Sequence, residues 1–273
     1  MDINFAPPAE FVELAEKTKA FVIDKVIPYE KDPRWTSHGP TEELRLEMNA
    51  LARAAGVFAP HVPKEYGGMG LGPLANALFR AAERRAGRVT THFVSVAHAM
   101  TEQYLAAGIG TPAQYTRIFS GFDLEPFLNA KNDLALRAKL GLSPEDFVVG
   151  KVARLFEHKG HMDLLKACSM VAECFDNLKV LLVGDGVLRK KIEQFIASKK
   201  VAPWLRDRVV FAGLVRPEEV PNYIGIMDVV VHLSRREGLA RVLPQALAAS
   251  KPIIAYDCDG AREVCIDSET GFF

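Results

Sequence analysis

Apolar residues recur at helical spacing along the first part of the chain. Residues 9–28 and 42–56 each place apolar side chains three or four positions apart, and residues 74–85 continue this pattern. Thr41 is a suitable N-cap for the second stretch, and Gly56 suits its C-terminal end. The pattern predicts a small all-helical segment at the start of the protein.

After about residue 88, short apolar runs rich in β-branched residues alternate with helical stretches. Such alternation predicts an α/β fold, in which a parallel sheet is covered by helices on both faces and ligands bind at the carboxyl ends of the strands. The predicted strands lie within residues 92–97, 115–123, 147–155, 179–186, 208–213, 227–234 and 251–256, and the predicted helices within residues 99–108, 133–141, 160–175, 187–200, 217–225 and 243–250.

The composition is that of an ordinary globular protein. The 273 residues are 49% hydrophobic, and 34 basic residues balance 34 acidic ones, so no basic field recruits nucleic acid. No apolar run has the length of a membrane-spanning helix, and the first residues lack the pattern of a signal peptide. The four cysteines form no C-x-x-C pair, which is typical of reduced thiols. We therefore expect a cytoplasmic protein without a transmembrane segment or a nucleic-acid partner.

The loop after the predicted strand 147–155 carries two cations. Arg154 and Lys159 flank the turn, and Gly160 directly precedes the next predicted helix. Cations beside a helix N-terminus form a clamp for a diphosphate, because the backbone N–H groups there have no intrahelical partner. A solvated basic loop is the alternative interpretation.

The loop after the next predicted strand contains Gly184 and Gly186, which permit a ligand to approach the backbone between strand and helix. The full dinucleotide-binding fingerprint is not present, since Leu188 and Arg189 follow where another glycine is needed. A plain tight turn is the alternative interpretation.

A third loop follows the predicted strand 227–234 and places an acid directly before a glycine. The N–H groups of Gly238 and Leu239 can donate to a phosphate, while the carboxylate of Glu237 can accept hydrogen bonds from sugar hydroxyls. Gln245 lies eight positions after the acid and can reach the same crevice from the next helix. An acid favoured by the helix dipole is the alternative interpretation.

No group of histidines, cysteines and carboxylates has metal-ligand spacing, so we expect no metal site. Asp257, Asp259 and Glu263 form a small acidic loop after the last long apolar run. This loop is either a capped helix start or the edge of a donor site.

Together, these loops resemble the nucleotide-binding half of family 4 glycosyltransferases of the GT-B fold, from about residue 84 to the end. The resemblance implies a Rossmann-like parallel sheet that is the C-terminal half of a GT-B fold. It also implies a nucleotide-diphosphate sugar as donor, an acceptor hydroxyl, and neither an obligatory metal nor another cofactor. The motifs that carry it are R-L-x-x-x-K-G (154–160), G-D-G (184–186), F-A-G-L-V (211–215), E-G-L (237–239), the stretch 244–265 and E-T-G-F (269–272).

The resemblance also implies roles for individual residues. Arg154 and Lys159 would hold the diphosphate and offset the charge of the leaving group, and Glu237 would contact the donor sugar, so these three are the predicted catalytic residues. Gln245 stands where the family usually has a second glutamate on the ribose. The predicted donor-binding residues are Gly184, Gly186, Val215 near the base, Gly238 and Leu239 near the phosphates, and Gln245.

The first 83 residues resemble the N-terminal helical region of acyl-CoA dehydrogenases. The likeness rests on residues 21–28, 44–56 and, above all, V-P-K-E-Y-G-G-M-G-L-G at 62–72. It covers only the opening helices, so we infer no flavin chemistry. The predicted parts of the chain are residues 1–83 as this helical fragment, 84–122 as a remnant strand and helix with the interdomain connection, and 123–273 as the Rossmann-like domain that binds the nucleotide sugar.

The predicted function is glycosyl transfer from a nucleotide sugar to an unknown acceptor hydroxyl. An inactive form is included in this prediction, because the family's acceptor-binding half has no counterpart before residue 84. A nonenzymatic nucleotide-binding or interaction module is the alternative, followed by an acyl-CoA dehydrogenase-related fragment. The apolar faces of the N-terminal helices would suit a homo-oligomer interface.

Overall fold

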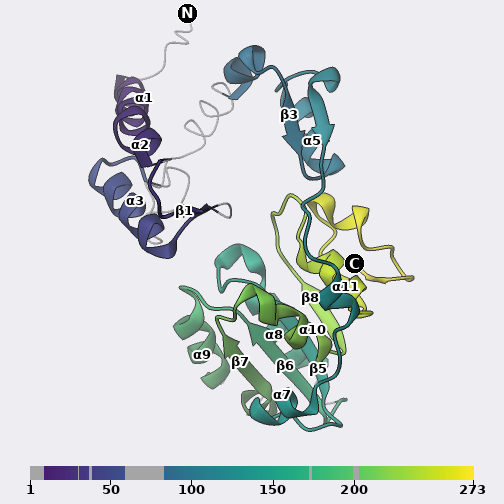
Figure 1. Cartoon of the computed structure of the whole chain (residues 1–273). Helices are drawn as coiled ribbons and strands as arrows, with labels where there is room; N and C mark the ends of the chain where they lie inside the picture. The colour runs from purple at the N-terminus through teal and green to yellow at the C-terminus, as the bar shows by residue number, and fades with distance from the viewer. Residues whose placement is uncertain (1–8, 30, 37–38, 59–82, 172–173, 199–202) are drawn as a thin grey trace, which may run out of the picture. The chain divides into compact units, whose positions relative to one another are not determined.

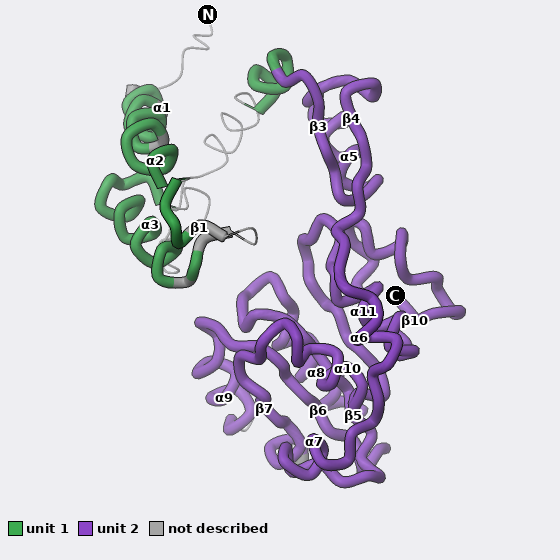
Figure 2. Tube along the Cα trace, viewed as in Figure 1, with its two compact units in different colours: residues 1–89 green, residues 90–273 purple. Residues whose placement is uncertain are grey.

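The computed structural model divides the chain into two compact units, residues 1–89 and 90–273 (Figure 2). The predicted boundaries after residues 83 and 122 stay predictions. The motif at 62–72 and most of the predicted helix 74–85 lie outside the described residues. The structure describes residues 9–29, 31–36, 39–58, 83–171, 174–198 and 203–273.

The first helical stretch of the N-terminal unit changes its winding before it ends. It consists of α1 (Ala9–Phe21), a π-helical turn (Val22–Val26) and α2 (Ile27–Tyr29). A proline ring inside an α-helix collides with the carbonyl four residues earlier, here that of Asp24. The wider π-helical turn before Pro28 relieves this collision, so the helix continues one residue past the proline and then stops.

The second helix, α3 (Glu42–Ala54), begins and ends where its signals predict. The hydroxyl of Thr41 accepts a hydrogen bond from the backbone N–H of Leu44 at 3.4 Å, and Gly56 follows the helix with a φ of +68°. A short antiparallel ladder, formed by β1 (Trp35–Thr36) and β2 (Gly39–Pro40), precedes this helix.

A six-stranded, fully parallel sheet forms the centre of the second unit (Figure 1). Its order, β10-β9-β8-β5-β6-β7, is that of a Rossmann-like sheet, in which the chain moves outward from the middle in both directions. The predicted α/β fold is therefore confirmed, and the strand order reverses between β5 and β8. The strands are β5 (Phe147–Val152), β6 (Leu178–Val183), β7 (Val209–Gly213), β8 (Val229–His232), β9 (Ile253–Ala255) and β10 (Gly271–Phe272).

Helices cover both faces of this sheet, as the uninterrupted apolar strands require. Val148 and Val149 are neighbours in β5 and belong to two different core clusters, because successive side chains of a strand point to opposite faces. One cluster includes α8 (His161–Val171) and α9 (Arg189–Ala197). The other includes α6 (Glu125–Leu128), α10 (Val220–Gly225) and α11 (Val242–Ala248), and α7 (Leu134–Lys139) packs at its border.

A smaller β-α-β lobe precedes the sheet within the same unit. It consists of β3 (Phe93–Ser95), α5 (His98–Ala106) and β4 (Tyr115–Arg117), and the two strands pair in parallel. The rings of Phe93 and Tyr115, which lie opposite each other in the ladder, stack with centroids 4.7 Å apart. None of the helices that the structure describes combines the length and the apolar character needed to cross a membrane.

Arg137 ties α7 to the strands of the main sheet from within the core. Its side chain is 2% exposed, and its guanidinium donates to the carbonyl oxygens of Ser143, Asp146 and Ile226 at 2.9–3.1 Å. It also contacts the carboxylate of Asp228 at 3.3 Å. All of these acceptors belong to backbone or side chains at the amino ends of β5 and β8, so one buried cation aligns the two central strands.

We predict that Arg137→Met destabilises the protein by about 3–5 kcal/mol, because it leaves buried carbonyl oxygens without donors. The measurement is the free energy of unfolding from urea denaturation. Lys139→Met, an exposed change on the same helix, is the control and should stay within about 0.5 kcal/mol of the wild type. Equal stability of the two variants would contradict the assigned role.

Candidate functional site

The loops that follow β5 and β8 meet at the point where the strand order reverses. Gly160 lies directly before α8 with a φ of +69°, in the left-handed region. A Cβ atom added there would overlap the carbonyl oxygen of Leu233, which follows β8. Two features therefore require glycine at this position, namely its positive φ angle and the close approach of the two backbones.

Polar contacts connect the same two loops. The N–H of Arg235 donates to the carbonyl of His158 at 2.9 Å, and its guanidinium pairs with Asp163 in the first turn of α8 at 3.0 Å. Lys159 Nζ pairs with Glu237 Oε2 across the crevice. The structure thus brings together Lys159 and Glu237, two of the three predicted catalytic residues, and it does so at the carboxyl edge where ligands of such sheets bind.

Asp259 holds the backbone of the glutamate loop. Its Oδ2 accepts a hydrogen bond from the N–H of Glu237 at 2.5 Å, and its Oδ1 accepts one from the side chain of Gln103 in α5 at 2.9 Å. Asp259 has a φ of +49°, which is uncommon for a residue other than glycine and favours short polar side chains. One carboxylate therefore positions Glu237 and joins the β3–α5–β4 lobe to the site.

Glu263 makes the second connection between this lobe and the site. Its Oε1 accepts a hydrogen bond from the N–H of Ala99 in the first turn of α5 at 3.0 Å. The predicted acidic loop thus forms the 3₁₀ turn η7 (Asp259–Glu263), whose two acids hold α5 against the loop after β8.

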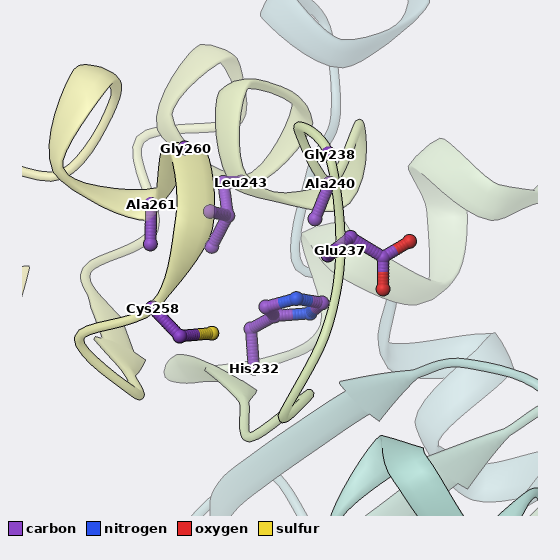
Figure 3. Close-up of a pocket in the computed structure, with 8 residues that line it drawn as sticks. All are labelled: His232, Glu237, Gly238, Ala240, Leu243, Cys258, Gly260 and Ala261. Carbon is purple, nitrogen blue, oxygen red and sulfur yellow. The ribbon is translucent and has the colours of Figure 1, made fainter. Parts of the chain in front are cut away.

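A pocket lies between the glutamate loop and η7 (Figure 3). The imidazole of His232 lies between the side chains of Cys258 and Glu237 in this view. The thiol of Cys258 donates to the carbonyl of Ser234 at 2.9 Å, which fixes one wall. The residues that line the pocket are His232, Glu237, Gly238, Ala240, Leu243, Cys258, Gly260 and Ala261.

Arg154, the third predicted catalytic residue, takes a different direction. Its side chain is exposed, and its guanidinium lies over the ring of Phe156 at 5.3 Å from the centroid. It makes no ion pair within the part of the chain that the structure describes. The loop motif places Arg154 beside the crevice, but its contact with the diphosphate stays a prediction.

The two glycines after β6 have a packing role in this structure. A Cβ atom added to Gly184 would overlap the carbonyl oxygen of Ala153, and one added to Gly186 would lie 2.7 Å from that of Leu155. Both glycines have positive φ values. They let the loop after β6 lie directly on the loop after β5, and their contact with a donor stays a prediction.

The other predicted donor-binding residues surround the crevice at different depths. Gly238 lies against Met100 of the lobe, so that an added Cβ would be 2.5 Å from the methionine methyl group. Leu239 and Gln245 are half-buried after β8 and in α11, respectively. Val215 follows β7, at the edge of the sheet, and packs against the core. Their contacts with a donor stay predictions.

Lys151, which lies in β5 and is 1% exposed, is not among the residues predicted from the sequence. Burial, followed by the positive charge of Lys159, lowers its pKa to about 7. The signal was present, since a lysine inside an otherwise apolar strand is unusual in a sheet that is covered on both faces. Of the residues that the structure describes, no three histidines, cysteines or carboxylates could hold a metal ion together.

The site therefore combines two kinds of group. A cation in the loop after β5 and the N-terminus of α8 suit an anionic ligand, and a carboxylate in the loop after β8 suits the hydroxyl groups of that ligand. His232 is neutral near pH 7, because burial and then the charges of Lys151 and Lys159 lower its pKa to about 3. The local charge near the pocket is thus set by lysines and carboxylates.

Solved structures with a similar fold include the Anabaena protein HepE. Its complex with UDP-glucose has a TM-score of 0.63 and 26% sequence identity, and the alignment covers 83% of this chain and 62% of HepE. Its complex with UDP and glucose has a TM-score of 0.62 and 25% identity, and the alignment covers 83% of this chain and 61% of HepE.

Curated relatives are glycosyltransferases. The alpha-monoglucosyldiacylglycerol synthase of Acholeplasma laidlawii is 31% identical over 59% of this chain and 40% of the relative. The GDP-mannose-dependent alpha-mannosyltransferase of Mycobacterium tuberculosis is 28% identical over 71% of this chain and 46% of the relative. The chain spans less than half the length of each of these two relatives.

Two family models match this chain. The N-terminal domain of acyl-CoA dehydrogenases matches residues 8–122, and glycosyl transferases group 1 matches residues 132–273. Both predicted resemblances are thereby confirmed, and the first extends beyond residue 83 into the β3–α5–β4 lobe. The second match spans more than half of the 273 residues and includes the loops after β5 and β8, so the chain belongs to the glycosyl transferases of group 1.

Proposed function

We propose that this protein binds a nucleotide-diphosphate sugar at the carboxyl ends of β5 and β8 and transfers the sugar to an acceptor hydroxyl. The ion pair between Lys159 and Glu237 carries this proposal. In this pair, a cation that would bind the diphosphate lies beside a carboxylate that would accept hydrogen bonds from sugar hydroxyls, at the reversal point of the sheet. Membership of the glycosyl transferases of group 1 supports the same reaction class.

The charge of each predicted catalytic side chain indicates its role in the proposed transfer. Cleavage of the bond between the sugar and the diphosphate leaves the negative charge on the diphosphate, where Lys159 and the N-terminus of α8 would stabilise it. Arg154 would add its charge after turning away from Phe156, and its exposed position permits this movement. Glu237, held at its backbone by Asp259, would orient the sugar through its hydroxyl groups.

Similar proteins suggest two candidate donors, which differ in their base and sugar. HepE was solved with UDP-glucose, and a mycobacterial relative depends on GDP-mannose. Both donors have two phosphates and a hexose, so both match the pocket chemistry of a cation beside a carboxylate. We take UDP-glucose as the first probe and GDP-mannose as the second.

We predict that the full chain binds UDP-glucose or GDP-mannose with a Kd in the micromolar to low millimolar range, measured by isothermal titration calorimetry, as expected for a partly open polar site. Release of nucleoside diphosphate that depends on an added sugar or lipid acceptor, with the donor sugar recovered on that acceptor, would then demonstrate transfer. Binding without transfer or hydrolysis would support the nonenzymatic alternative. If neither these donors nor ADP-glucose produces a binding signal, the proposed function is wrong.

We further predict that Glu237→Ala weakens the binding of UDP-glucose about 10- to 100-fold relative to that of UDP, because only the sugar loses its hydrogen-bond acceptor. Loss of the carboxylate also frees Lys159, so the affinity for UDP should stay equal or increase. Calorimetric titration of both ligands measures the ratio. Glu218→Ala, at an exposed position, is the control. An equal loss for both ligands would contradict the sugar contact.

A further inference from the structure

Lys151 is a buried amine whose charge interacts with Lys159 and Glu237 of the proposed donor site. It occupies the last position but one of β5, and its side chain is 1% exposed. Its Nζ makes no hydrogen bond to any residue that the structure describes. An unpaired ammonium is costly in the protein interior, so burial favours the neutral amine and lowers the pKa of Lys151 to about 7.

The charged groups that act on Lys151 belong to the loops after β5 and β8 and to the first turn of α8. Lys159 lowers its pKa, whereas Glu237 and Asp163 raise it. Each of these carboxylates is already paired with another cation, Glu237 with Lys159 and Asp163 with Arg235. Lys151 therefore has no carboxylate of its own to compensate a positive charge.

Two buried histidines also interact with this lysine. His161 is the first residue of α8, and His232 is the last residue of β8. Burial, and then the charges of Lys151 and Lys159, lower the pKa of each imidazole to about 3. Both are neutral near pH 7, so neither adds nor removes charge when a ligand arrives there.

We propose that Lys151 is a third phosphate-binding residue, which takes up a proton from solvent when the diphosphate of a nucleotide sugar enters the crevice between the loops after β5 and β8. The inference rests on the proposed function. A bound diphosphate brings two negative charges to this edge of the sheet, and these charges supply the compensation that the occupied carboxylates do not. The neutral amine and one solvent proton give an ammonium, and no bond of the donor changes.

This coupling makes donor binding depend on pH in a defined direction. Below pH 7 the amine is already protonated, so binding takes up no proton at Lys151. Above pH 7 the proton must be taken from solvent, so the affinity falls by up to tenfold for each pH unit until the pKa of the bound state is reached. A lysine at the protein surface would remain charged over this range and would give no such dependence.

The test is a calorimetric titration of the full chain with UDP-glucose at about pH 8, in two buffers that differ in their heat of ionisation. GDP-mannose replaces UDP-glucose if it is the donor that binds. Both phosphates of a nucleotide sugar are diesters, which do not titrate near neutral pH, so proton uptake comes from the protein. We expect an uptake close to one proton per bound donor in the wild type, because the free amine is mostly neutral one unit above its pKa.

Lys151→Met retains the length of the side chain without an amine and should bind the donor with no proton uptake. Lys166→Met, an exposed change in α8, is the matched control and should retain the uptake of the wild type. The proposal is overturned if the wild type binds the donor without proton uptake, or if Lys151→Met shows the same uptake as the wild type. A failure of all nucleotide sugars to bind would instead reject the proposed function, and this inference with it.

Stability provides a second measurement that needs no ligand. The folded pKa of Lys151, about 7, lies below the ordinary value of 10.5, so the unfolded chain binds more protons between these values. The protein should therefore become more stable as the pH rises from about 7 toward 10. We expect the urea midpoint to rise over this range in the wild type, and to rise less in Lys151→Met. Parallel pH profiles would show that Lys151 is charged in the free protein and would overturn the proposal.

Discussion

Gly160 and Leu233 bring the loops after β5 and β8 into backbone contact, and the geometry of the site depends on this approach. The two strands are neighbours in the sheet although about 80 residues of chain separate them. Reversal of the strand order at this point sends the two chains away from each other to opposite faces, which opens a crevice above their carboxyl ends. A side chain at residue 160 would separate the loops and, with them, Lys159 from Glu237.

The charged side chains at the rim of this crevice form ion pairs between its two sides. Each carboxylate on the rim, Glu237 and Asp163, pairs with one cation from the opposite loop. Such pairs are partly exposed and contribute little to stability, so a ligand can exchange them for contacts of its own at a small cost. Lys151 differs because it is buried below the rim, where a change of charge has a much larger effect. The paired side chains at the rim can therefore bind the ligand, whereas Lys151 below them can change its protonation when a charged ligand binds.

Local patterns in the sequence were sufficient to predict most helices and strands, and to predict that Lys159 and Glu237 lie at the same edge of the sheet. Apolar runs predicted the strands of the main sheet, and the run 227–234 predicted that Glu237 lies in the loop after β8. The contact between Lys159 and Glu237 follows once both loops are placed at the same edge. The direction of the Arg154 side chain could not be predicted from the sequence. An exposed guanidinium can contact any aromatic ring or carboxylate that the fold brings close to it, and here it lies over Phe156.

Other features could be recognised only in the structure. The ladder of β1 and β2 is too short for a periodic signal, and the π-helical turn before Pro28 is a local response to a proline inside a helix. The burial of Lys151 was indicated by its apolar neighbours, but its missing partner could be seen only after Glu237 and Asp163 had been assigned to other cations.

The shared carboxylate of Asp259 has a mechanical consequence for the second unit. One oxygen holds the main chain at Glu237, and the other holds Gln103 on a helix that precedes the sheet in sequence by more than 40 residues. A swing of α5 away from η7 breaks the outer hydrogen bond and loosens the inner one, at a cost on the order of 1 kcal/mol for each exposed bond. The linkage is reciprocal, so a ligand that immobilises Glu237 also restrains the movement of α5. Ligand binding in the crevice and the position of the β3–α5–β4 lobe are therefore thermodynamically coupled.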